Sequence, residues 1–243
     1  MLSLPPERHA IHQVSVMSAL LDGVYDGDQT IGQLLHHGDF GLGTFDALDG
    51  ELLVLDGVAY RLRSDGDATV AAADDRTPFA VITTFVAHAQ CEVPTRATQA
   101  DIVELLADVV PSQNYLYAIR IRGRFVLVRT RTVARQSQPY RPLVAVTAGE
   151  PVVEQRNVFG TLAGFRTPLY ERGIGVPGGH VHFIDESLRR GGHVLDFILE
   201  HGTIDVCIGT DLHLALPMTE AFAGAHLDPA DLDFQVERTE RHD

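Results

Sequence analysis

Two histidines separated by one residue, inside a glycine-flanked segment, place the tightest constraint on what this chain can form. The segment reads Gly178-Gly179-His180-Val181-His182-Phe183, and Gly191-Gly192-His193 follows it. On a β-strand, residues two apart project from the same face, about 7 Å apart along the backbone. Glycine weakens a strand interior, so its frequency here indicates close approach of backbone or of a ligand. We therefore expect a strand that presents His180 and His182 on one face.

Imidazoles from His180, His182 and His193 can converge on one metal ion, since zinc binds histidine nitrogen at about 2.0–2.1 Å. Three neutral ligands leave the ion its double positive charge and an open coordination position, as in catalytic sites. Taken alone, a His-x-His pair is also common as a surface pair or a hydrogen-bonded core pair. The pattern therefore predicts a metal site but does not name a reaction.

Composition restricts the partners of the chain. Its 243 residues are 45% hydrophobic and 21% charged, which is typical of globular domains. The net charge of −14 argues against binding to nucleic acid or to an anionic membrane surface. We find no transmembrane run and no secretory signal at the N-terminus, so a soluble cytoplasmic protein is expected. Cys91 and Cys207, the only cysteines, exclude a disulfide framework and a thiolate metal cluster.

Local patterns predict many short strands and few helices. A strong hairpin signal, Asp56-Gly57, joins apolar strands at 52–55 and 58–62. The clearest helix is 99–110, with Thr98 and Asp101 as a capping pair and Pro111 after it. Further strands are expected at 80–88, 115–122, 125–133, 157–166, 181–184, 194–199 and 204–208, and further helices within 13–22, at 31–36 and at 228–240.

These elements predict an α+β fold with mixed or antiparallel sheets in two lobes. Residues 134–151 carry three prolines and form the expected seam. We expect an N-terminal mixed-sheet lobe at 1–140 and a C-terminal lobe with the histidines at 141–243, which together form one functional unit.

Several blocks, in order along nearly the whole chain, are similar to the alpha-acetolactate decarboxylase family. The longest is His-His-Gly-Asp-Phe-Gly-Leu-Gly-Thr-Phe-Asp-Ala-Leu-Asp-Gly-Glu-Leu-Leu-Val-Leu-Asp-Gly at 36–57. The others are 13–27, 77–81, 129–131, 160–170, the histidine cluster and 211–217.

The resemblance implies an enzyme, a carboxy-lyase that converts 2-acetolactate to acetoin and carbon dioxide without oxidation, in the acetoin and 2,3-butanediol branch of pyruvate metabolism. By the same resemblance, His180, His182 and His193 hold zinc, which stabilises an enediolate formed when carbon dioxide leaves. The family also implies a homodimer.

Further site residues follow from the resemblance. They are Arg131 as the active-site arginine, Glu51 as the conserved acid, Thr44 as a substrate contact, and Glu240 as a second carboxylate near the C-terminus, with Glu237 as its rival. Arg131 can hold the departing carboxylate in a fork, and Glu51 or Glu240 can deliver the proton.

Each of these four residues also has a simpler interpretation. Glu51 suits a solvated charge at the start of a strand, and Arg131 a charge on an edge strand. Glu240 suits a solvated helix end, and Thr44 a turn hydroxyl. His213 belongs to the last block of the resemblance and stays a candidate.

Two other classes of protein carry similar histidine patterns. The small plant and prokaryote conserved domain has a Gly-x-His-x-His element and includes regulators, so residues 150–215 could form a metal-stabilised regulatory module. Such modules lack the block at 36–57, which separates the two hypotheses. A cupin-like dioxygenase fits less well, because the Gly-Gly-His element does not match its pattern.

Overall fold

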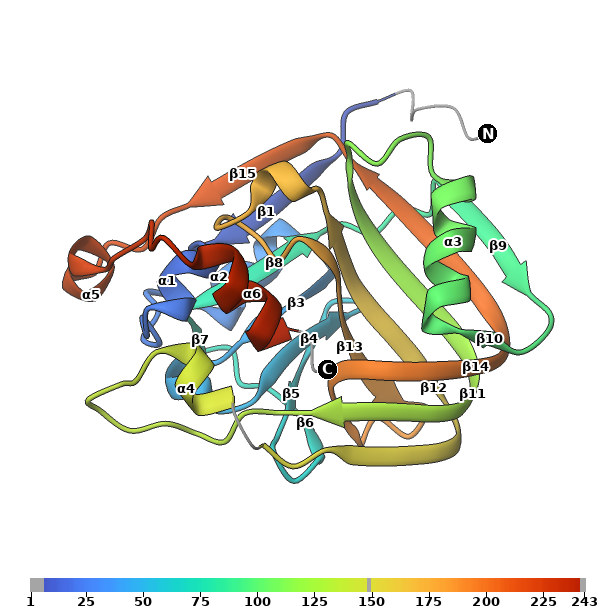
Figure 1. Cartoon of the computed structure of the whole chain (residues 1–243), viewed down its shortest axis with the longest axis horizontal. Coiled ribbons are helices and arrows are strands. Elements are labelled where there is room, and N and C mark those ends of the chain that lie inside the picture. Colours follow the sequence, from blue (N-terminus) through green and yellow to red (C-terminus); the bar gives the residue numbers. More distant parts are fainter. Residues whose placement is uncertain (1–6, 148–149, 241–243) are drawn as a thin grey trace.

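The computed structural model describes residues 7–147 and 150–240, apart from the side chains of Glu237 and Glu240. Two β-sheets face each other, and helices surround them (Figure 1). The first sheet has seven strands in the order β15 (Asp211–Ala215), β1 (Ala10–Val14), β8 (Phe79–Thr83), β3 (Phe40–Thr44), β4 (Glu51–Leu55), β5 (Val58–Leu62) and β6 (Ala68–Val70). It is mixed, because β15 runs parallel to β1 while the other neighbours are antiparallel.

The second sheet is antiparallel and curls on itself. Its strands follow the order β10 (Ala97–Thr98), β14 (Gly191–Gly209), β11 (Leu116–Arg131), β12 (Val153–Thr167) and β13 (Gly178–Asp185), and β9 (Ala89–Val93) also pairs with β14. Strand β13 pairs with β12 and also with the first residues of β14. This closure brings the beginning of β14 back beside β13. A separate pair consists of β2 (Gln29–Thr30) and β7 (Arg76–Thr77).

Helices are few and mostly short. They are α1 (Met17–Leu21), α2 (Ile31–Leu34), α3 (Gln99–Val109), α4 (Leu143–Thr147), α5 (Glu220–Gly224) and α6 (Leu232–Glu240), with 3-10 turns η1 (Leu35–His37), η2 (Asp46–Leu48) and η3 (Leu169–Glu171). Helix α3 packs on the second sheet away from the first, and α6 contacts α1 and α4 (Figure 1). Within the described residues, none of these helices has the length and apolarity needed to span a bilayer.

The alternation of apolar residues along β4 explains the layering. Leu52 and Val54 belong to a core cluster shared with α2, whereas Leu53 belongs to the cluster between the two sheets. All three side chains are fully buried. Because successive strand residues face opposite sides, a strand buried on both faces needs a continuous apolar run, which Leu52-Leu53-Val54-Leu55 supplies.

The predicted fold class is confirmed, and so are the hairpin at Asp56-Gly57 and the helix after Thr98. Two pairs of strands that the sequence predicted as separate are each one long strand in the structure. The strands expected at 115–122 and 125–133 form β11, and those expected at 194–199 and 204–208 form β14. Residues 115–133 were expected to break at Gly123, but β11 continues through it, and Gly123 pairs with Gly160 on β12 and Gly202 on β14. A Cβ on Gly123 would lie 2.3 Å from the carbonyl oxygen of His201, so the glycine permits close approach without ending the strand.

Both sheets take strands from either side of residue 140. Strand β15 joins the first sheet beside β1, and β11 lies in the second sheet between β12 and β14. The two sheets therefore do not correspond to the two expected lobes, 1–140 and 141–243. The division of the chain into these lobes stays a prediction.

Candidate active site

The curled second sheet brings the three predicted histidines together. His180 and His182 lie on the same face of β13, and His182 is directly opposite His193 on β14. Close strand packing here depends on glycine, because a Cβ on Gly191 would lie 2.3 Å from the carbonyl oxygen of Phe183. The sequence pattern thus predicted both the shared face and the reason for the glycines.

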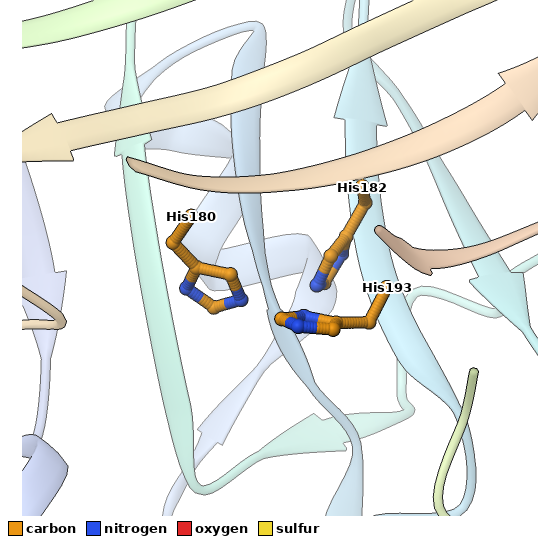
Figure 2. Close-up of side chains that lie close together, drawn as sticks. All are labelled: His180, His182 and His193. Carbon is orange, nitrogen blue, oxygen red and sulfur yellow. The ribbon is translucent and has the colours of Figure 1, made fainter. Parts of the chain in front are cut away.

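The three imidazole rings turn toward a common point (Figure 2). Their ring centroids are 5.0–5.6 Å apart, and one ligand atom from each ring lies within 4.8 Å of the other two. Small side-chain rotations would let one ion contact all three nitrogens. These residues form the one group of three potential ligands found in the described part of the chain.

A backbone carbonyl of the first sheet fixes the orientation of His182. Its Nδ1 donates a hydrogen bond to the carbonyl oxygen of Leu52, at 2.9 Å. Because a carbonyl only accepts, the proton of the neutral ring lies on Nδ1, and Nε2 presents a lone pair. Nε2 is buried and has no hydrogen-bond partner among the described residues. A buried acceptor aimed at two other imidazoles fits a metal ion, and histidine ligands commonly donate their second nitrogen in this way.

The surroundings favour the neutral form of the rings. Burial, together with the nearby positive charge of Arg131, lowers the pKa of His180 to about 4. Burial also holds the pKa of His182 well below its usual value, with a contribution from His180 and an opposing one from the hydrogen bond to Leu52. Neutral imidazole is the form that binds metal, so both rings are ready to act as ligands at neutral pH.

Arg131 lies beside the histidines because β11 ends there. It is directly opposite His193 in the β11–β14 ladder, and its side chain is only 4% exposed. Its guanidinium donates to the backbone carbonyl of Thr239, on α6. The buried position is at odds with the interpretation of Arg131 as a charge on an exposed edge strand. Arg129, by contrast, is half-exposed and lies near Glu154.

Glu51 and Thr44 face the histidines from the first sheet. They are paired across β3 and β4, and the Glu51 Oε2 atom lies 3.8 Å from His182 Nε2. The Glu51 side chain is 17% exposed, so it is not the solvated charge that its position in the sequence would also allow. The Thr44 hydroxyl donates to the carbonyl of Gly50 over 3.0 Å, and the residue lines the pocket, so its role as a substrate contact stays a prediction.

All these groups except His182 line one pocket. Polar lining comes from Thr44, Glu51, Arg131, Thr147, His180, His193 and Thr239. Much of the remaining wall is apolar and was missed from the sequence: Met17, Leu20, Leu48, Phe79, Val133 and Leu143. No local motif marks these residues, since they come from α1, α4, a strand and two connecting segments. The pocket suits a small ligand with a polar side and an alkyl side.

The C-terminal carboxylates lie at the end of the described chain. Helix α6 includes both Glu237 and Glu240, but their side chains are outside the described part of the structure. Thr239, between them, is buried and lines the pocket. The assignment of a carboxylate to Glu240 or Glu237 therefore stays a prediction.

His213 lies away from these residues. Its ring stacks on that of His12, which in turn stacks on His37, with centroids 4.8 and 4.5 Å apart and planes within 25°. Nearly parallel rings do not aim their nitrogens at one point, unlike the rings of His180, His182 and His193. The stack therefore does not form a second metal site of the same kind.

Comparison with known proteins gives one consistent result. Residues 11–229 match the sequence model of a family described as alpha-acetolactate decarboxylase. The alpha-acetolactate decarboxylase of Bacillus subtilis strain 168 is 46% identical over 230 residues, which cover 95% of this chain and 90% of that protein. That of Methanosarcina mazei is 41% identical over 231 residues, 95% of this chain and 80% of that one.

A solved structure agrees with these sequence matches. The crystal structure of alpha-acetolactate decarboxylase from Bacillus subtilis strain 168 superposes with a TM-score of 0.94, at 45% identity, over 96% of this chain and 100% of that one. The matched region starts at residue 11 and includes the block at 36–57, which a small regulatory domain would lack.

Proposed function

The chain belongs to the alpha-acetolactate decarboxylase family and is a carboxy-lyase, and we propose that it forms acetoin from 2-acetolactate in a zinc-dependent reaction. One observation carries the proposal: Arg131, Glu51 and Thr44 line the same small pocket as His180 and His193. A cation, a carboxylate and imidazoles thus surround one space, an arrangement that suits a small hydroxy-keto acid.

We propose that His180, His182 and His193 hold the zinc ion. The buried Nε2 of His182 and its hydrogen bond through Nδ1 support this role. When bound, zinc would supply Lewis acidity that offsets the negative charge developing on the substrate oxygens. Three imidazoles also accept iron or manganese, so metal content has to be measured.

Arg131 is proposed to bind the carboxylate that leaves as carbon dioxide. A guanidinium matches a carboxylate with two parallel hydrogen bonds, which orients the carbon–carbon bond that breaks. The burial of Arg131 strengthens such a contact, since water does not screen it. When the bond breaks, its electron pair stays on the remaining carbon skeleton, which must then gain a proton.

Glu51 is proposed to supply or relay this proton, with Glu240 or Glu237 as the second carboxylate. The support for Glu51 is its position at the pocket wall, 3.8 Å from His182 Nε2. A proton donor must lie within hydrogen-bond reach of the reacting carbon, directly or through one water. The Thr44 hydroxyl donates to Gly50 and keeps lone pairs that can accept from the substrate hydroxyl.

We further propose that the protein is a homodimer, as the family resemblance implies. Light scattering of the purified protein would decide this point, because a mass of about twice the 26.5 kDa chain is expected.

The test of the function is acetoin formation from racemic 2-acetolactate by purified, metal-replete protein. We expect acetoin and carbon dioxide in equal amounts at a rate far above spontaneous decarboxylation. A folded, metal-loaded protein that gives only the spontaneous rate would contradict the proposal.

A further inference from the structure

We propose that Leu48 determines the size of the alkyl group that the pocket accepts on the hydroxyl-bearing carbon of the substrate. The inference rests on the proposed function, and it assigns substrate specificity to a residue outside the polar groups of the site. Three features of the loop between β3 and β4 support it: its backbone conformation, the contacts that hold it, and the place of the Leu48 side chain.

The backbone at Leu48 has an unusual conformation. Ala47 and Leu48 have φ of 57° and 54°, which is the left-handed region. Residues with a Cβ rarely adopt it, and two in succession are rarer still. Such strain persists where the surrounding structure fixes it, and it concentrates at functional sites.

Hydrogen bonds from two other segments hold this conformation. The Ala47 N–H donates to the carbonyl of Tyr25 at 2.8 Å, and the Ala47 carbonyl accepts from the N–H of Gln136 at 2.7 Å. Within the loop, the Gly50 N–H donates to the carbonyl of Leu48 at 2.8 Å. The backbone of Leu48 is thus tied on both sides, and the loop cannot shift easily to make room.

Next to the loop, ion pairs fix the position of Asp49. Its carboxylate contacts Arg61, on β5, at 2.5 Å and Arg63, just after β5, at 2.9 Å. The Arg61 guanidinium also lies 4.1 Å from the centre of the Phe45 ring. Residues on either side of Leu48 are therefore anchored to the first sheet.

This rigid loop delivers the Leu48 side chain to the pocket. The residue is 3% exposed and lines the pocket beside Thr44 and Glu51. A substrate held by Arg131 and the histidines directs its polar groups toward them, so its alkyl substituent meets the apolar wall. Leu20 and Leu143 also belong to that wall, but they lie on short helices, whereas Leu48 is fixed by the contacts described above.

The test compares two substrates in one assay. One is 2-acetolactate, and the other is its homologue with an ethyl group in place of the methyl group on the hydroxyl-bearing carbon. One methylene in an apolar pocket typically changes kcat/KM by about 10- to 200-fold. We expect Leu48→Ala to raise the ratio of kcat/KM, ethyl over methyl, by about tenfold.

Two further variants make the result independent of folding. Glycine adopts positive φ without strain, so Leu48→Gly should fold and raise the ratio at least as much. Leu48→Met, of similar volume, should keep the ratio of the unsubstituted protein. Leu34→Ala is the matched control. Leu34, the last residue of α2, is also buried, but it packs on the other side of the first sheet, so the ratio of kcat/KM values should not change.

The outcomes separate the two proposals. A rise of more than threefold in Leu48→Ala and Leu48→Gly, absent from Leu34→Ala, supports the role of Leu48. A smaller change, in variants and unsubstituted protein that all form acetoin, overturns it. Absence of acetoin from the unsubstituted protein contradicts the proposed function instead.

Discussion

His182 on the second sheet donates its Nδ1 proton to the backbone carbonyl of Leu52 on the first sheet, over 2.9 Å. The contact joins the two sheets beside the three histidines, and it leaves Nε2 as the atom of His182 that can bind a metal ion. Leu52 directly follows Glu51 on β4, so the same strand that orients the histidine also carries the carboxylate. The proposed metal binding and proton delivery thus both depend on how the two sheets face each other.

Replacing His182 should remove metal and activity together. We expect His182→Ala to weaken zinc binding by more than about 100-fold and to lower activity in parallel, because a ligand and its fixed orientation are both lost. Metal content by atomic emission, measured beside acetoin formation, checks this. His201→Ala, an exposed histidine on β14, is the control and should retain both. Full zinc occupancy in His182→Ala would exclude this ligand assignment.

Arg131→Ala should retain zinc but lower kcat/KM about 100- to 1000-fold, because the carboxylate loses its cationic partner. Arg131→Lys should restore only part of the activity, since an ammonium does not form the paired contact. Arg129→Ala, two residues earlier and half-exposed, should have nearly normal activity. Normal kinetics in Arg131→Ala, with zinc bound, would remove this residue from the mechanism.

Replacing Glu51 by its amide tests proton delivery. Glu51→Gln keeps the size of the side chain, so zinc and stability should change little, while kcat should fall about 100-fold or more. Glu240→Gln and Glu237→Gln belong to the same series, and we expect Glu240→Gln to be the slower of the two. If Glu51→Gln turns over at the normal rate, the proton comes from the C-terminal carboxylate.

Local pattern was enough to predict that His180 and His182 share one face of a strand. A spacing of two on a strand puts His180 and His182 on one face whatever the rest of the fold, and the glycines indicated close packing. The hairpin at Asp56-Gly57 and the capping pair of α3, Thr98 and Asp101, are also local signals, and they are confirmed.

Long-range features could not be predicted in this way. Whether a strand continues through Gly123 depends on its partners, Gly160 and Gly202, which lie far away in the sequence. The apolar wall of the pocket likewise combines α1, α4 and the loop at Leu48, and no spacing rule links them. Positive φ at Leu48 is set by contacts with distant segments, against the preference of leucine itself.

Acid should destabilise the fold in part through the stack of His12, His37 and His213. Burial, followed by the neighbouring His37 and His213, lowers the pKa of His12 below its usual 6.5. As the pH falls below 6.5, His12 takes up a proton in the unfolded chain before it does so in the folded chain. The free energy of unfolding therefore falls as the pH falls through this range. His12→Phe, which can stack but cannot titrate, should lose less stability between about pH 7.5 and 5.5. Urea unfolding of both proteins in a chelator checks this, and equal losses would show that His12 has no part in it.

The most direct test of the account is zinc reconstitution of the metal-free protein. Chelated protein should form acetoin only at the spontaneous rate, and the rate should rise in proportion to bound zinc until one ion per chain is present. His182→Ala, treated in the same way, should gain no activity at these zinc concentrations. Full activity of the chelated protein, with metal shown to be absent, would contradict the account.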